Sequence, residues 1–174
     1  MRETVVLIIG GIVAFVLQFV LASNISILGV MPNFVLAYVA IVAMLRQSDL
    51  IIGMAFILGL LTDLTGSGSV GVMAALFTLA ACIASRTAES MGHDTVVASL
   101  LISMMTSLVV EVCYALLYVI TVGASIVDVF LLRALPCALY DCAVVLILMP
   151  LLSYLLERSA PSHTVPESST VRLR

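Results

Sequence analysis

The chain has 174 residues, of which 63% are hydrophobic and 10% are charged, and its mean hydropathy is +1.30. A composition this apolar does not fold around one soluble core, so it predicts a polytopic membrane protein. The net charge of −3, carried on scattered charges with no lysine among them, argues against a nucleic-acid surface.

Apolar segments separated by polar turns predict an all-α bundle of six transmembrane helices. The first follows Arg2 and lacks a convincing small-x-small cleavage site, so we interpret it as a span and not as a removed signal. The expected spans are residues 4–22, 32–46, 50–63, 69–86, 95–122 and 136–156. Together with their turns they form one membrane domain, residues 1–158.

The second and third segments are short for a hydrocarbon core of about 30 Å. Either flanking residues, 27–31 and 64–68, lengthen them, or they are discontinuous helices that shape a polar cavity. The fifth segment is longer than a bilayer requires, so it is expected to tilt or protrude.

The end of the chain, residues 159–174, contains prolines and hydroxyl residues without apolar periodicity, which predicts a disordered tail. With both termini in the cytoplasm, Arg133 is the one arginine expected on the outer side. The arginines expected on the inner side are Arg2, Arg46, Arg86, Arg158, Arg172 and Arg174.

The polar stretch GLLTDLTGSGSVG, residues 59–71, interrupts the apolar sequence. It lacks the GK[ST] of a phosphate-binding loop, and its single carboxylate is too few for a calcium loop. Gly66, Gly68 and Gly71 are expected to supply positive φ angles in a tight turn, and Gly59 and Gly71 to let two helices approach closely. Asp63 is expected to accept hydrogen bonds from backbone N–H groups of the turn or of the next helix.

Residues 53–86, GMAFILGLLTDLTGSGSVGVMAALFTLAACIASR, resemble the signature region of the rod-shape-determining MreD family. The shared pattern is a glycine-containing helix ending in GLL-x-D, a glycine-bearing turn, and a glycine that opens an alanine- and leucine-rich helix. The matching residues are Gly53, Gly59, Leu60, Leu61, Asp63, Gly71, Ala75 and Leu76. The segment LPCALYDCAVVLILMPLLSYLLER is similar to the family's last helix. The chain departs from the family at Met54, where an aromatic residue is frequent, and at Asp141, where asparagine is common.

The resemblance implies a non-enzymatic scaffold of the cell-elongation machinery in the bacterial cytoplasmic (inner) membrane. Its implied partner is the single-pass protein MreC, and through it MreB filaments and the peptidoglycan synthases. The resemblance also implies a fold similar to the S-components of energy-coupling-factor vitamin transporters. That similarity supplies the alternative function, a membrane subunit that binds a small vitamin-type solute.

Charged residues within apolar segments cost about 2.5–3.5 kcal/mol each on insertion scales, so they are expected to have partners. Asp63, Glu111, Arg133 and Asp141 are expected in the outer half of the bundle, where Arg133 reaches Glu111 or Asp141. Two alternatives stay open. Arg133 lies with Asp128 on an amphipathic surface helix, or Glu111 is protonated and bonds a neighbouring helix.

Each of the two functions predicts a different surface. A scaffold is expected to dock a partner's transmembrane helix against small residues, either Gly53 with Gly59 or Gly71 with Ala74 and Ala75. A solute site is expected to use the outer acidic and basic side chains named above. The chain has no Trp, five Tyr and six Phe, which gives little aromatic surface for a vitamin ring and favours the scaffold.

No catalytic, cofactor or metal site is expected. The cysteines Cys82, Cys113, Cys137 and Cys142 lie in apolar runs without metal-ligand spacing. No serine within an apolar segment has a histidine or lysine nearby that would activate it as a nucleophile.

Overall fold

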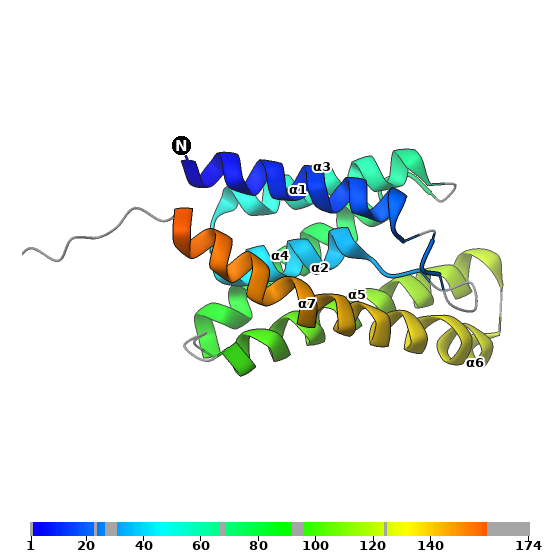
Figure 1. Ribbon diagram of the computed structural model, residues 1–174. Coiled ribbons are helices and arrows are strands. Elements are labelled where there is room, and N and C mark those ends of the chain that lie inside the picture. The colour runs from blue at the N-terminus through cyan, green and yellow to red at the C-terminus, as the bar shows by residue number, and fades with distance from the viewer. Residues whose placement is uncertain are drawn as a thin grey trace, which may run out of the picture.

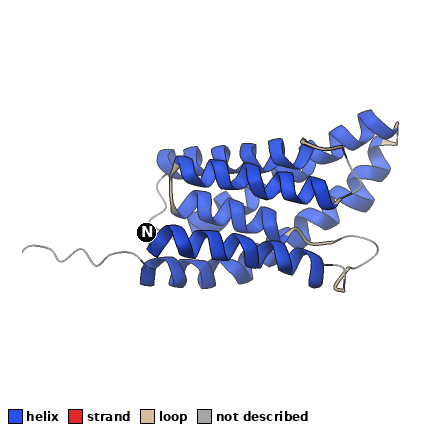
Figure 2. Cartoon of the chain, turned by 90° about the horizontal axis from the view of Figure 1, so that it is seen from above, coloured by secondary structure: helices blue, strands red, loops and turns tan. Residues whose placement is uncertain are grey.

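The computed structural model describes residues 2–22, 24–26, 31–66, 69–91, 96–123 and 125–159. Within these ranges the chain is helical, with short connections and no strand. The helices lie side by side along a common direction (Figures 1 and 2). Their bounds are α1 Arg2–Val20, α2 Phe34–Leu45, α3 Asp49–Thr65, α4 Val72–Met91, α5 Val96–Val122, α6 Ile126–Val129, η1 Phe130–Ala134 and α7 Leu135–Ser159.

In the described part of the chain, three helical stretches are long and apolar enough to cross a membrane. They are Val72–Ser90, Val97–Val122 and Ile126–Leu156. The other apolar helices are shorter. The apolar part of α1 is Thr4–Val20, and α2 and α3 have 12 and 17 residues. Six complete spans therefore stay a prediction, as does the likeness to a transporter S-component.

Helix α2 forms the centre of the bundle. Its sequence FVLAYVAIVAML is apolar on every side, and all its residues from Phe34 to Met44 are buried. It packs against α1, α4, α5 and α7. The surrounding helices carry large apolar side chains that point outward, among them Ile8 and Ile12 on α1 and Ile147 on α7. This pattern gives the bundle an apolar outer surface, as contact with lipid requires.

The ends of α2 show that it is a truly short helix. It begins after Asn33, whose side chain accepts a hydrogen bond from the Leu36 N–H (3.0 Å), and it ends at Arg46. Its length is about 18 Å, against about 40 Å for α5. Residues 31–33 are not helical, so the expectation that Met31 lengthens this segment is wrong. The third segment is lengthened, because α3 continues to Thr65.

The two ends of the bundle differ. The start of α1, the α2–α3 connection and the end of α7 lie together at what we call the terminal end (Figure 1). There Arg46 donates a hydrogen bond to the Leu156 carbonyl at 3.4 Å, and Arg86 and Arg158 belong to the same end. The α3–α4 connection marks the opposite end, the turn end, where α5 and α7 project past the start of α2.

The last three helical elements follow one another without an interruption. Residues 126–159 are helical throughout, and Phe130–Ala134 form a π-helical turn. Asp128 and Arg133 therefore lie on a helix that continues into α7, and not on the separate surface helix considered above. The side chain of Arg133 lies outside the described part of the structure, as do residues 160–174, for which a disordered tail stays a prediction.

Two neighbouring glycines bring α1 close to α2 and α3. A Cβ atom on Gly10 would lie 2.8 Å from the Tyr38 hydroxyl, and one on Gly11 would lie 3.3 Å from Leu58 Cδ1. The Tyr38 hydroxyl donates to the Leu7 carbonyl at 2.6 Å, which joins α2 to α1 by a buried hydrogen bond. Nothing in the sequence pattern around Gly10 and Gly11 indicates this close approach.

Candidate functional site

The polar stretch at the turn end is organised by Asp63, which lies near the end of α3 with 6% of its surface exposed. Its Oδ2 accepts hydrogen bonds from the N–H groups of Gly71 (2.8 Å) and Ala74 (3.1 Å), and its Oδ1 from that of Met73 (3.0 Å). The first N–H groups of a helix lack partners within the helix and favour a negative charge nearby. Asp63 therefore caps α4 from the neighbouring helix, and the hydrogen bonding expected of it is confirmed.

The glycines of this stretch divide into two kinds. A Cβ atom on Gly59 would lie 2.5 Å from the Met73 carbonyl oxygen and 2.6 Å from Ala74 Cα, so Gly59 permits contact between the backbones of α3 and α4. Gly71 has a φ of +100° and nothing within 4 Å of a built Cβ. It serves the conformation of the turn and not the close approach of helices.

Gly66 differs from the expectation. Its φ is −86°, which any residue adopts, so the predicted positive φ is wrong at this position. Gly66 ends α3, and its N–H bonds the Thr62 carbonyl at 3.0 Å. Gly68 lies outside the described residues.

The small residues expected to dock a partner helix are not equally accessible. Gly59 and Ala74 are buried against each other, so neither is available to another protein. Gly53 is exposed, with nothing within 4 Å of a built Cβ, and Ala75 is also exposed. Of the pair Gly53 and Gly59, only Gly53 presents an open surface.

A second polar junction holds the start of α2. The Asn33 N–H donates to Asp141 Oδ1 of α7 at 2.7 Å. From α1, Gln18 accepts a hydrogen bond from the Phe34 N–H at 2.7 Å and donates one to the Pro32 carbonyl at 3.1 Å. The N-terminus of this buried helix is thus fastened to helices on both sides, as unpaired backbone groups inside an apolar bundle would be costly.

Asp141 is completely buried, and its second oxygen, Oδ2, has no hydrogen-bond partner within the described structure. Glu111 on α5 is half-buried and close enough to act electrostatically on Asp141. These two acids come together as expected, whereas Asp63 is engaged at the α3–α4 turn. Pairing of either acid with Arg133 stays a prediction.

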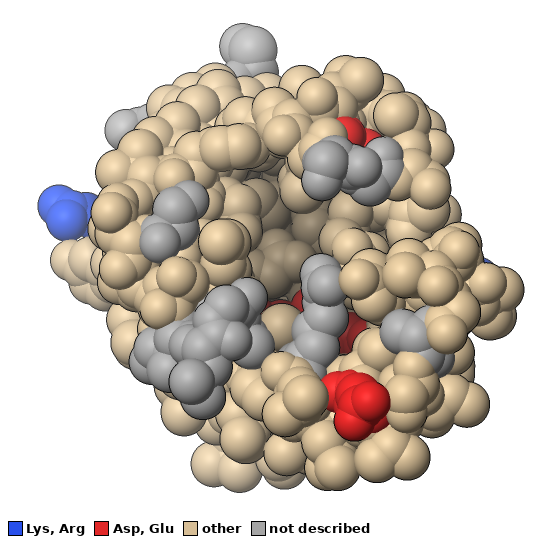
Figure 3. Space-filling view, turned by 90° about the vertical axis from the view of Figure 1, so that its right-hand side faces the viewer, with Lys and Arg blue, Asp and Glu red and all other residues tan. Residues whose placement is uncertain are grey.

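The turn end is hollowed near its middle, and acidic side chains are visible at the floor of the hollow (Figure 3). The described acidic residues in this half of the bundle are Asp63, Glu111, Asp128 and Asp141. In the described residues, no three His, Cys, Asp or Glu side chains gather closely enough to hold a metal ion.

The residues that the sequence analysis missed are Gln18 and Asn33. Each left a signal: Gln18 is a polar residue inside an otherwise apolar segment, and Asn33 is a favourable N-cap directly before an apolar run. Their partner Asp141 is 108 residues from Asn33, so the sequence alone gave no means of joining them.

Comparison with known proteins gives one family. The family model described as rod shape-determining protein MreD matches residues 1–159, which include every described helix. No curated protein and no solved structure matches the chain. The apolar helices and the family match together indicate an integral inner-membrane protein with a role in rod shape determination. The chain belongs to the MreD family of rod shape-determining proteins.

Proposed function

We propose that the protein is a non-enzymatic membrane scaffold of the cell-elongation machinery, which binds an MreC-like single-pass protein and helps to organise lateral peptidoglycan synthesis. Through that partner it would be linked to MreB filaments and to the peptidoglycan synthases. The family's role in rod shape supports the proposal. The observation that carries it is the use of the Asp63 carboxylate, which accepts three hydrogen bonds from the chain's own backbone.

This use of polar groups argues for a scaffold because a solute site needs donors and acceptors that can face the solute. Asp63 is one of the side chains that a solute site is expected to use, and both its oxygens accept hydrogen bonds from the backbone. Gln18 and Asn33 are likewise bonded to backbone groups of their own chain. These polar groups at the turn end therefore hold helices together.

One observation favours the alternative function, a solute-binding subunit. Asp141 Oδ2 is buried without a partner among the described residues, and the turn end is hollowed (Figure 3). A solute with a hydrogen-bond donor would satisfy that oxygen. In this case the protein should copurify with ATPase and coupling subunits, and not with a single-pass partner.

We place the partner's transmembrane helix over Gly53 on α3. Gly53 has open space above it, and the side chains of Leu50 and Ile57, about one turn away on either side, are exposed. A glycine flanked by apolar side chains lets a second helix approach closely. In a membrane the hydrophobic effect does not drive helices together, so their association depends on such close packing.

Both termini are proposed to lie in the cytoplasm. This orientation is supported by the common location of Arg46, Arg86 and Arg158 at the terminal end, because cytoplasmic segments are enriched in positive charge. A single cysteine at Arg158, in a variant without the native cysteines, should react with an impermeant thiol reagent only after the cells are opened. Labelling in intact cells would contradict this orientation.

A quantitative pull-down tests the docking surface. The tagged full-length protein is purified from cells as wild type, Gly53→Leu and Ala143→Leu, and copurified proteins are quantified by mass spectrometry. Ala143 is an exposed alanine on α7, so it provides a matched enlargement at another lipid-facing position. The proposal predicts that Gly53→Leu reduces recovery of the MreC-like protein at least about tenfold, equivalent to about 1.4 kcal/mol. Equal recovery from all three would contradict it.

A further inference from the structure

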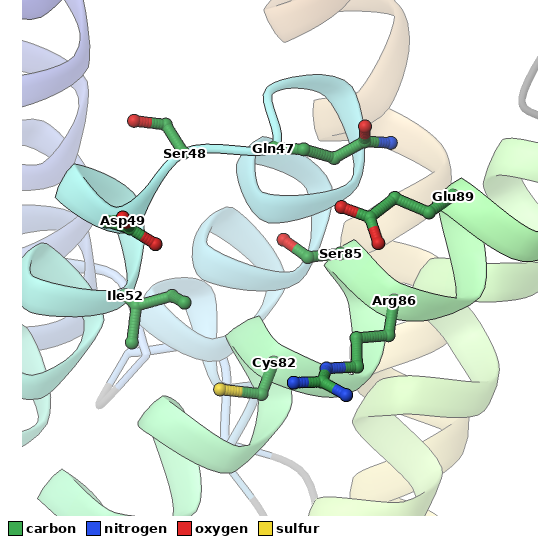
Figure 4. A pocket seen from close by; sticks show the side chains of 8 residues that line it. All are labelled: Gln47, Ser48, Asp49, Ile52, Cys82, Ser85, Arg86 and Glu89. Atoms are coloured by element: carbon green, nitrogen blue, oxygen red, sulfur yellow. The ribbon is translucent and has the colours of Figure 1, made fainter.

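A polar pocket of about 510 Å³ opens at the terminal end, away from both junctions described above. It lies between the α2–α3 connection and α4, and Figure 4 shows the side chains that line it. The lining residues with charged groups are Asp49, Arg86 and Glu89, and Ile52 and Ser85 lie between them and the core. We propose that this pocket binds the headgroup of a membrane lipid that carries a phosphate and a primary ammonium, as in a phosphoethanolamine lipid.

The pocket exists because α3 and α4 are not in close contact along their whole length. Their backbones touch at Gly59 and Ala74 near the turn end. Two turns closer to the start of α3, Ile52 lines the pocket opposite Ser85 of α4. The Ser85 hydroxyl donates to the Ala43 carbonyl of α2 at 3.0 Å, which closes the rear of the pocket. The opening therefore faces away from the core.

The charges in the pocket have both signs. Figure 4 shows the carboxylates of Asp49 and Glu89 approaching from different sides and the Arg86 guanidinium extending beside Cys82. Among the described residues no ion pair joins Arg86 to either acid, and all three side chains are exposed. A ligand with one negative and one positive group would therefore meet complementary charges that are not already used.

The chemistry of these groups selects the headgroup. Arginine binds phosphate oxygens through paired N–H donors, and a primary ammonium has three N–H donors for carboxylates. A trimethylammonium group has none, which disfavours a choline headgroup. One guanidinium and two carboxylates give the pocket a net charge of −1, which disfavours a purely anionic headgroup.

The position of the pocket suits a lipid better than a soluble ligand. It lies beside the polar connection that separates two apolar helices, the level at which headgroups are expected. One turn nearer the bundle's middle, Phe56 on α3 is 49% exposed and Leu79 on α4 is 43% exposed. These side chains continue the pocket as an apolar surface, along which acyl chains would lie.

Native mass spectrometry of the full-length protein in detergent tests the proposal with three lipids that share their acyl chains. The headgroups are phosphoethanolamine, phosphocholine and phosphoglycerol. We expect the phosphoethanolamine lipid to be retained at least about fivefold better than either of the others. Equal retention of all three would overturn the proposal.

Matched variants locate the site. Arg86→Gln and Glu89→Gln are expected to lower retention of the phosphoethanolamine lipid severalfold. Arg158→Gln, at an exposed arginine of the same end, and Asp128→Asn, at an exposed acid of the turn end, are expected to leave it unchanged. All four positions are exposed, so the variants should fold. Retention that is insensitive to Arg86→Gln and Glu89→Gln would contradict the assignment.

Two further experiments test whether the ligand is a membrane lipid, a soluble headgroup or a peptide. Soluble glycerophosphoethanolamine at the same concentration is expected to leave the lipid bound, and its displacement of the lipid would overturn the assignment to a lipid. A photo-crosslinking amino acid at Gln47, which lines the pocket, is expected to give an adduct of lipid mass in membranes. An adduct with a protein chain in its place would show a peptide-binding pocket and contradict the proposal.

Discussion

The Asp63 carboxylate of α3 lies 3.1 Å from the backbone nitrogen of Ala74, so that one helix supplies the N-terminal cap of the next. The same carboxylate bonds two further N–H groups of the turn. The two helices that it joins also touch backbone to backbone at Gly59. The polar stretch of residues 59–71 thus joins α3 to α4.

Replacing Asp63 by alanine should destabilise the fold. The change leaves three partly buried N–H groups, in the turn and at the start of α4, without an acceptor, at a cost of about 1–3 kcal/mol. Asp63→Asn keeps one side-chain oxygen and should fall between alanine and wild type. Unfolding in detergent can be followed with a thiol-reactive dye, because all four cysteines are half-buried. Asp128→Ala serves as the control, and equal melting temperatures for Asp63→Ala and wild type would refute the capping role.

A methyl group should be far more harmful at Gly59 than at Gly53. At Gly59 it would meet the backbone of α4 at 2.5 Å, and overpacking of this kind costs about 1–3 kcal/mol. At Gly53 it meets nothing within 4 Å, and alanine is the better helix former. The same dye assay should show a lower melting temperature for Gly59→Ala and an unchanged or higher one for Gly53→Ala. The opposite order would mean that α3 and α4 do not pack as described.

Alanine substitutions at the two turn glycines, Gly71 and Gly66, should also differ in their effect on stability. Gly71→Ala forces a φ of +100° on a residue with a side chain, at a cost of about 1–2 kcal/mol. Gly66→Ala places alanine at a φ of −86° and should be close to neutral. Comparison of the two melting temperatures checks this, and equal losses at both positions would argue against the turn conformation.

Asp141 and Glu111 should be energetically coupled. Asp141→Asn keeps an acceptor for the Asn33 N–H and removes the unfavourable interaction between two carboxyl groups, so it should preserve or raise stability. Asp141→Ala removes that acceptor and should lower stability by about 1–3 kcal/mol. A double-mutant cycle of Asp141→Asn with Glu111→Gln should give a coupling energy of at least about 0.5 kcal/mol. Strict additivity would show that the two carboxyl groups do not interact. Cycles that combine Arg133→Gln with Glu111→Gln or with Asp141→Asn test the expected ion pair of Arg133.

The sequence predicted the parts of this fold that depend on local chemistry. Apolar segments gave the helices, and an aspartate before a glycine turn gave the cap, because a helix start needs acceptors wherever it occurs. The close contact at Gly59 followed from the absence of a side chain. The identity of the helix that packs there did not follow, because a glycine on a helix can be covered by a helix of its own chain or by a partner.

The features that the sequence did not predict depend on contacts between distant residues. Asn33 and Asp141 are 108 positions apart, so their hydrogen bond follows only from the packing of α2 against α7. The π-helical turn at Phe130–Ala134 is likewise hidden, because its residues are ordinary helix formers. The pocket at the terminal end results from the separation of α3 and α4, and no single residue in the sequence predicts it.

Cell shape tests the central claim most directly. In a rod-shaped host the native copy is replaced by the wild type, Gly53→Leu or Ala143→Leu, each brought to the same level in the membrane. A scaffold that docks its partner over Gly53 predicts wide or round cells with Gly53→Leu and normal rods with Ala143→Leu. Rods of normal width with Gly53→Leu would contradict the docking surface, and rods that persist after the protein is removed would contradict the scaffold itself.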